Sequence, residues 1–191
     1  ATHAYGDNGD YLVTVFVKDD DGPETSDSFT VHVDNVAPAM EAGPNQSTDE
    51  GTVISLISAA FTDPGFTYGP AGTIETFEVI LDWGDGTIEY PVPAIIMGSR
   101  GILTVGDLSE SHAYGDNGEY TVRLTVTDDD TDWGEDSFTV TVANKAPVLD
   151  AGPDDSIDEG ATIYFEGTFT DQGWLDTHEA AWDFGDGTPV V

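Results

Sequence analysis

Acidic side chains gather at a few short sites in this sequence, and the chemistry they offer is that of a hard metal ion. Three aspartates stand together at residues 128–130, and Asn35 and Asp63 are further oxygen donors earlier in the chain. Carboxylate and amide oxygens are the ligands of Ca²⁺, which takes about six to eight of them. Cys is absent and the four His are scattered, which disfavours soft transition metals. Calcium is therefore the cofactor that the composition favours.

The net charge and the missing motifs exclude other classes of function. With 38 Asp and Glu against 4 Lys and Arg, the net charge is −34, so neither nucleic acid nor an anionic membrane surface is an expected partner. No apolar run approaches the ~20 residues that would span a bilayer. The sequence contains no H-E-x-x-H, no G-x-S-x-G and no phosphate-binding Gly-rich loop. We expect no enzyme, although composition alone leaves a glycosidase pair of carboxylates open.

An internal repeat organises the chain. The heptapeptide HAYGDNG at residues 3–9 recurs at residues 112–118, an offset of 112 − 3 = 109. DWGDGT at residues 82–87 matches DFGDGT at residues 183–188, an offset of 183 − 82 = 101, so repeat two carries about seven extra residues near positions 68–73. Boundaries at Asn-x-Ala-Pro predict the C-terminal half of one unit at 1–36, a complete unit at 37–145 and the N-terminal half of a third at 146–191. We expect either an excerpt of a longer array or half-units that complement each other between molecules.

Within each repeat, apolar residues alternate with Thr or acids at a period of two, which is typical of half-buried strands. The clearest runs are FEVILDW at residues 77–83, YTVRLTV at residues 120–126 and FTVTV at residues 138–142. Strands of this kind form antiparallel sheets that pack face to face, and about 109 residues suit one immunoglobulin-like sandwich. The predicted fold is all-β, a tandem of immunoglobulin-like antiparallel β-sandwiches whose first and last units are incomplete.

These motifs, in this order, resemble the PKD (polycystic kidney disease) repeat. The resemblance rests on WDFGDGT at residues 182–188, the two HAY motifs, Gly-x-Tyr-x-Val, the Asp-rich segment at residues 126–130 and the Asn-x-Ala-Pro linker. Repeat two departs from it with LDW at residues 81–83, which keeps an aromatic residue on the same strand face. The resemblance implies a cell-surface or secreted β-sandwich used as a spacer, an adhesive module or an aid to substrate binding. It also implies calcium near the linker, as in similar domains of bacterial collagenases.

In such a sandwich the B–C loop, where we expect Asp63, and the F–G loop, where we expect Asp128, Asp129 and Asp130, lie at the end where the linker enters. Their carboxylates would therefore meet the preceding repeat. Two carboxylates 4 Å apart repel by about 1 kcal/mol in water and about 4 kcal/mol at an effective dielectric of 20. We expect a calcium ion to relieve this repulsion at each junction. Its candidate ligands are Asn35, Asp63, Asp128, Asp129 and Asp130 in repeat two, Asn144 and Asp171 in repeat three, and Asp19 and Asp21 in repeat one. The alternative is that the Asp-rich turn is a solvated loop that keeps a sheet edge soluble.

The predicted function is a non-enzymatic extracellular array, stiffened by calcium and made of neighbouring copies of the repeat, with assembly into a filament as an extension. An alternative from another class is an ancillary binding or spacer region of a secreted hydrolase. In that case Trp133 or Trp174, both predicted in loops, would contact an extracellular polysaccharide or protein fibre. A third interpretation, adaptation to high salt, would explain the acidity without specific metal binding.

Overall fold

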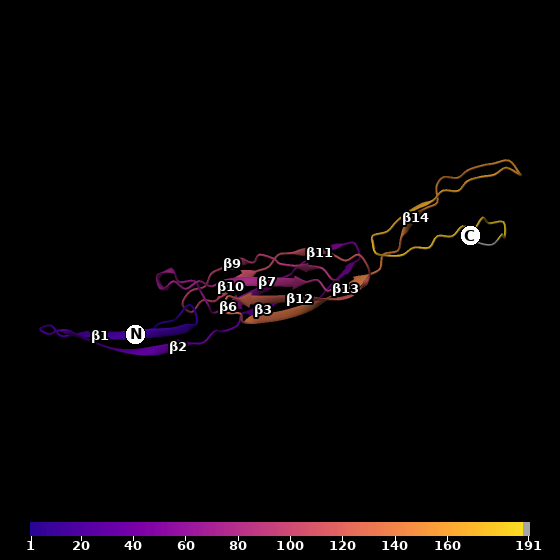
Figure 1. Ribbon diagram of the computed structural model, residues 1–191. Helices are drawn as coiled ribbons and strands as arrows, with labels where there is room; N and C mark the ends of the chain where they lie inside the picture. The colour runs from indigo at the N-terminus through magenta and orange to yellow at the C-terminus, as the bar shows by residue number, and fades with distance from the viewer. Residues whose placement is uncertain (189–191) are drawn as a thin grey trace. The chain divides into compact units, whose positions relative to one another are not determined.

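The computed structural model describes residues 1–188, which are nearly all strand and turn (Figure 1). The elements are β1 (Gly9–Lys18), β2 (Glu24–Val33), β3 (Ala39–Glu41), β4 (Gln46–Asp49), β5 (Val53–Ser55), β6 (Ala60–Asp63), the 3₁₀ turn η1 (Gly69–Ala71), β7 (Phe77–Asp82), β8 (Ile88–Glu89), β9 (Ala94–Ile96), β10 (Thr104–Asp107), β11 (Ser111–Ala113), β12 (Gly118–Asp128), β13 (Trp133–Ala143), β14 (Val148–Asp150) and β15 (Thr168–Thr170). None of the described helical turns is long and apolar enough to cross a membrane.

Repeat two forms the sandwich that the alternation predicts. One sheet has the strand order β3-β6-β10-β9, and the other has the order β4-β13-β12-β7-β8, with β7 and β12 antiparallel. The Phe61 ring on β6 meets the Phe77 ring on β7 with centroids 4.7 Å apart, which joins the two sheets. The fold class predicted from the sequence is confirmed.

The faces of the strands also follow the prediction. On β7, Val79 and Leu81 are buried whereas Ile80 between them is 43% exposed. Trp83, directly after β7, is fully buried, so the LDW variant keeps its aromatic side chain in the core. The seven extra residues of repeat two form a small excursion, in which η1 lies between Tyr68 and Thr73 and these two residues form an isolated bridge.

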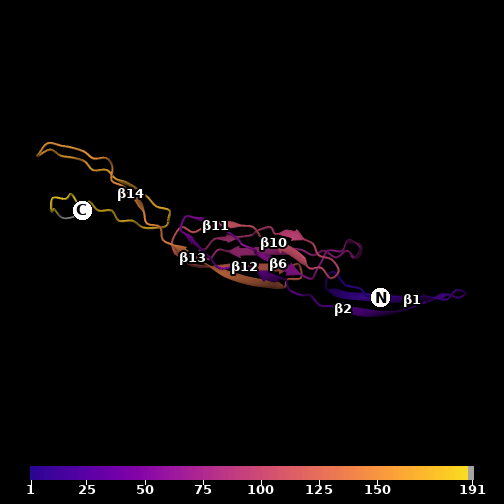
Figure 2. The ribbon, with the colours of Figure 1, turned by 180° about the vertical axis from the view of Figure 1, so that it is seen from behind.

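Repeat one is a long hairpin whose apolar face is open. β1 and β2 pair over their whole length, from Gly9 opposite Val33 to Lys18 opposite Glu24 (Figures 1 and 2). At its base the Tyr11 hydroxyl donates to the backbone oxygens of Asp7 (2.9 Å) and Asn8 (3.0 Å), the contact of a tyrosine corner. The apolar face of the hairpin, defined here as Val15, Val17 and Phe29, is 53%, 61% and 56% exposed. The counterparts 109 residues later, Leu124, Val126 and Phe138, are 0%, 0% and 3% exposed.

Repeat three likewise exposes the residues that form the core of repeat two. β14 pairs with β15 in an antiparallel two-stranded sheet. Its open face, defined here as Leu149, Phe169 and Phe184, is 72%, 46% and 45% exposed. The matching residues of repeat two are Met40, Phe61 and Trp83, which are 8%, 0% and 0% exposed.

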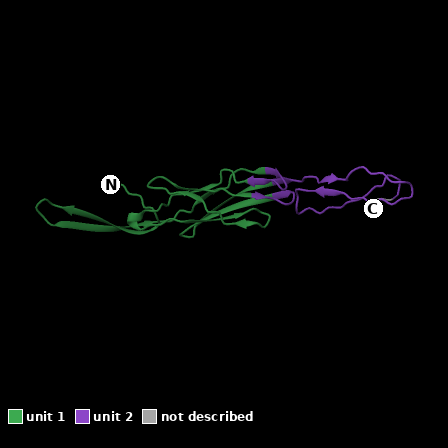
Figure 3. Cartoon of the chain, turned by 90° about the horizontal axis from the view of Figure 1, so that it is seen from above, with its two compact units in different colours: residues 1–46, 55–111, 120–140 green, residues 47–54, 112–119, 141–191 purple. Residues whose placement is uncertain are grey.

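By contacts, the chain forms two compact units (Figure 3). Unit 1 comprises residues 1–46, 55–111 and 120–140, and unit 2 comprises residues 47–54, 112–119 and 141–191. The acidic cluster at the start of repeat two lies wholly in unit 1, and the cluster at the start of repeat three lies wholly in unit 2. Each can therefore be described on its own.

Candidate metal centre

The first acidic cluster forms where the linker after β2 reaches the end of β12. Asn35 donates through Nδ2 to the carboxylates of Asp128 (2.8 Å) and Asp132 (3.0 Å). Asp128 in turn accepts the backbone N–H of Asp132 through Oδ1 at 2.9 Å, which fixes the tight turn after the strand. The structure thus brings the predicted residues Asn35 and Asp128 together, with the amide nitrogen of Asn35 toward the carboxylates.

Asp63 is the buried member of this cluster. It is the last residue of β6 and not a loop residue as the sequence suggested, and its side chain is almost entirely covered. Its Oδ1 accepts the N–H of Gly65 at 2.5 Å, whereas its Oδ2 is buried and accepts no hydrogen bond from the described residues. Burial raises the pKa of Asp63, and the nearby charges of Asp128 and Asp129 raise it further.

Glu75 is a member that sequence reasoning missed. It lies just before β7 and is 7% exposed. Burial is the main cause that raises its pKa to about 8, followed by the charges of Asp129 and Asp63. A weak signal existed in the sequence: with the 101-residue offset, 75 + 101 = 176, and position 176 is also acidic. The signal was obscured because the seven extra residues of repeat two end directly before Glu75.

Asp7 completes the cluster from the side of repeat one. Its pKa is raised by burial first and then by the charges of Asp130 and Asp129, so the Asp-rich turn faces it. Asp129 also accepts the N–H of Thr76 at 3.2 Å. A small cavity of about 130 Å³ is lined by Asp7, Asn35 and Glu75, among others, which leaves room for a bound ion. Asp7 of repeat one and Glu75 of repeat two therefore line the same cavity.

A protein-family comparison bears on this arrangement. The family model described as PKD domain matches residues 35–142 and again residues 144–191. The chain belongs to the PKD domain family. Domains of this family are immunoglobulin-like modules with adhesive or structural roles, typically extracellular and generally non-catalytic.

The second PKD match contains a related but different cluster. Asp171, the counterpart of Asp63, accepts the N–H of Gly173 at 2.9 Å and lies 3.0 Å from Nε2 of His178. The hydrogen bond from His178 is the main cause that lowers the pKa of Asp171, so this carboxylate already has a partner. Asn144, the other predicted ligand of this repeat, is exposed on the linker.

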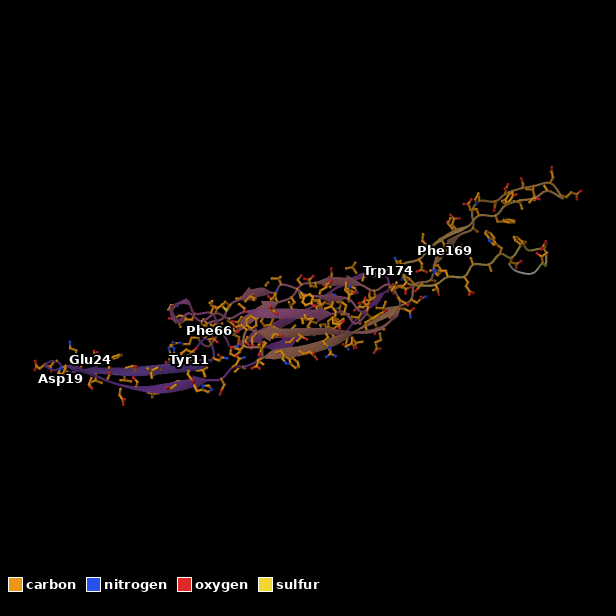
Figure 4. The ribbon with its side chains drawn as sticks, viewed as in Figure 1. Tyr11, Asp19, Glu24, Phe66, Phe169 and Trp174 are labelled. Atoms are coloured by element: carbon orange, nitrogen blue, oxygen red, sulfur yellow. The ribbon has the colours of Figure 1, made fainter. Side chains whose placement is uncertain are left out.

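Asp19 and Asp21, the predicted ligands of repeat one, lie on the turn that joins β1 to β2. Figure 4 shows Asp19 and Glu24 at the tip of this hairpin, with Tyr11 toward its base and Phe66 beyond it. Within unit 1 they are therefore remote from the cluster around Asp63. As counterparts of Asp128 and Asp130, they occupy the same type of strand-end turn in repeat one.

The two tryptophans proposed as ligand contacts differ in their surroundings. Trp133 is the first residue of β13 and not a loop residue as predicted, and it is 61% exposed. Trp174 lies in a turn, and its indole covers the Cα of Gly115, where an added Cβ would meet Nε1 at 2.5 Å. Phe66 covers Gly6 in the same way, with a Cβ there 2.9 Å from the ring. The aromatic residue three positions after Asp63 or Asp171 thus packs on the Gly-Asp turn of the preceding repeat.

Proposed function

We propose that this chain is a non-enzymatic, extracellular structural or adhesive array of PKD repeats in which Ca²⁺ holds consecutive repeats together. The observation that carries the proposal is the buried Oδ2 of Asp63, which accepts no hydrogen bond from the described residues. A buried ionised carboxylate is costly unless a cation or donors compensate it. A divalent ion beside Asp63 would provide that compensation.

The donor set fits calcium. Every candidate in the cluster offers oxygen, and the flexible coordination of Ca²⁺ tolerates carboxylates from several loops. Asp63, Asp128 and Asp129 would hold the ion from repeat two, and Asp7 would hold it from repeat one. Bound Ca²⁺ would supply positive charge where these carboxylates otherwise repel one another, at about 4 kcal/mol per close pair at an effective dielectric of 20. The ion would therefore fix the direction in which the hairpin of repeat one leaves the sandwich.

The test is calorimetric titration of Ca²⁺ into the full chain and its Asp63→Asn variant. We expect the variant to lose one binding event or to weaken it at least tenfold, because asparagine keeps the shape but not the charge. Asp107→Asn, an exposed position on β10, is the matched control and should bind as the parent does. An Asp63→Asn isotherm that superimposes on the parent isotherm would refute calcium binding at this cluster.

Thermal unfolding in high sodium chloride, compared with unfolding in low salt with calcium, separates specific binding from general screening. If salt alone gives the thermal stabilisation that calcium gives in low salt, then the acidity serves screening and the proposed site is wrong. Extracellular modules bind calcium with dissociation constants of about 10⁻⁴–10⁻³ M, so millimolar titrations are the appropriate range.

As its partner we propose a second copy of this chain. In repeat two, β12 and β13 bury the apolar side chains whose counterparts are exposed on β1 and β2. Repeat three presents the complementary half of such a core, where Leu149, Phe169 and Trp182 line an open cavity of about 600 Å³. The hairpin of one copy would complete the sandwich of repeat three in the next copy, and head-to-tail repetition would give a filament.

Sedimentation velocity over a range of chain concentrations, with calcium present, tests this assembly. We expect species larger than the monomer to grow with concentration, and Phe29→Asp to abolish them by placing a charge on the apolar face. Thr30→Asp, on the opposite face of β2, should assemble like the parent. A chain that stays monomeric at every concentration, or a Phe29→Asp variant that assembles normally, would contradict the proposal.

A further inference from the structure

Glu50 is fully buried although it is charged in its ordinary state. It lies in the turn between β4 and β5, where its N–H donates to the backbone oxygen of Ala143 at 3.0 Å. Its Oε1 accepts the N–H of Lys145 at 2.6 Å, which ties the turn to the linker that leads into repeat three. Its Oε2 is buried and accepts no hydrogen bond from the described residues. Half of this carboxylate is therefore without compensation.

Two further carboxylates surround the uncompensated side. One ligand oxygen each from Glu50, Asp116 and Asp176 lies within 4.8 Å of the others. Glu50 and Asp176 meet over the backbone of Gly173, where an added Cβ would stand 2.8 Å from Cδ of Glu50 and 2.7 Å from Oδ2 of Asp176. Burial raises the pKa of Asp176 first, and the charges of Glu50 and Asp116 raise it next.

Lys145 and His178 are basic residues of unit 2. The Lys145 ammonium pairs with Asp49, whereas the His178 ring lies against Asp171 and its charge also partly opposes the rise in the pKa of Asp176. The backbone N–H of Lys145 reaches Glu50, but it carries no net charge. Three carboxylates thus converge at the start of repeat three, and Glu50, the completely buried one, has an oxygen that accepts no hydrogen bond from the described residues.

We propose that Glu50, Asp116 and Asp176 bind a divalent cation, Ca²⁺, at a site that does not use Asn144 or Asp171. Three carboxylates within 4.8 Å suit a hard cation, which backbone oxygens and water would complete to the higher coordination number that calcium takes. The inference rests on the proposed function only for its setting at a junction between repeats. Its residues are separate from the Asp63 cluster in unit 1.

The site joins repeat two to repeat three. Asp116 corresponds to Asp7 and Asp176 to Glu75, so both clusters contain one facing pair of acids. Glu50 is the third member, and it lies beside the turn that carries Asp116, since the N–H of Gly51 donates to the backbone oxygen of Tyr114 at 2.8 Å. Its backbone contacts with the linker mean that an ion here would fix repeat three to the last turn of repeat two.

Calcium titration of the full chain and its Glu50→Gln variant tests the site. We expect the parent to show two classes of binding event, and Glu50→Gln to lose one of them while it keeps the event that Asp63→Asn removes. Glu159→Gln is the matched control, because Glu159 is the counterpart of Glu50 in repeat three (50 + 109 = 159) and is exposed. If Glu50→Gln does not fold by circular dichroism, Asp176→Asn takes its place.

Thermal unfolding gives a second readout. In chelator, Glu50→Gln should melt higher than the parent, because a buried repulsion is removed, and calcium should raise its melting temperature less than it raises that of the parent. A purely structural role of Glu50 would leave the calcium response unchanged. A folded Glu50→Gln with both binding events intact overturns this inference and leaves the Asp63 site standing. Conversely, if Glu50→Gln loses one event while Asp63→Asn keeps both, this inference stands and the Asp63 site is refuted.

Discussion

Glu75→Gln is expected to stabilise the calcium-free chain by about 4–5 kcal/mol at pH 9 and to change stability little at pH 4. The pKa of Glu75 is raised from 4.5 to about 8 by burial and by the charges of Asp129, Asp63 and Asp7. Each unit of pKa difference corresponds to about 1.4 kcal/mol of stability. Glutamine has nearly the shape of the protonated Glu75 side chain and, like it, carries no charge. The substitution therefore removes the penalty of ionisation.

The direction of this pH dependence follows from proton linkage. Below pH 4.5 the Glu75 carboxyl is protonated in both the folded and the unfolded chain, so it costs nothing. Between pH 4.5 and 8 the unfolded chain loses the proton while the folded chain keeps it, so stability falls as pH rises. Above pH 8 the full penalty remains.

Urea unfolding in chelator at several pH values measures the difference. Glu78→Gln, an exposed acid on β7, is the control and should change stability by only about 0.5 kcal/mol or less at any pH. A stability difference between Glu75→Gln and the parent that does not grow from pH 4 to pH 9 would show that Glu75 titrates normally.

Trp83→Ala is expected to destabilise the sandwich of repeat two by about 3–5 kcal/mol. The side chain is fully buried, and truncation of a buried Trp loses its transfer free energy and leaves a cavity. The backbone cannot move to close that cavity, because β7, which ends directly before Trp83, is paired with β12 from Phe77 to Asp82. Guanidinium unfolding followed by far-ultraviolet circular dichroism measures the loss.

Ile80→Ala is the control for this substitution. Ile80 is 43% exposed on the opposite face of β7, so its truncation should cost about 1 kcal/mol or less. Trp83→Phe, the aromatic residue that repeat three carries at Phe184, should recover most of the stability. Equal losses for Trp83→Ala and Ile80→Ala would mean that position 83 is not part of the core.

Much of the fold was predictable from the sequence. The alternation in residues 77–83 and 120–126 identified which side chains are buried, since successive side chains of a strand point to opposite faces. The 109-residue repeat allowed repeats one and three to be recognised as partial copies of repeat two. The position of Asp63 at the end of β6, and of Trp133 at the start of β13, differed from the prediction by a residue or two, as element ends do.

The candidate sites were predictable only in part. Asn35 and Asp128 were expected together and are hydrogen-bonded, and Asp63 lies close enough to Asp128 for their charges to interact. Glu75 was missed as a cluster member because its neighbours in sequence give no sign of burial. The pairing of Asp171 with His178 was also missed, because these residues lie seven positions apart in an irregular segment.

By itself the sequence determined the strands, their buried faces, the repeat and the excess of negative charge, because each of these is a property of residue type and local spacing. The tertiary structure alone decided which of the 38 acids are removed from water and which carboxylates face one another. That decision depends on side chains brought together from distant segments, and the energy of a charge in a protein is set by those neighbours and by its exposure to solvent.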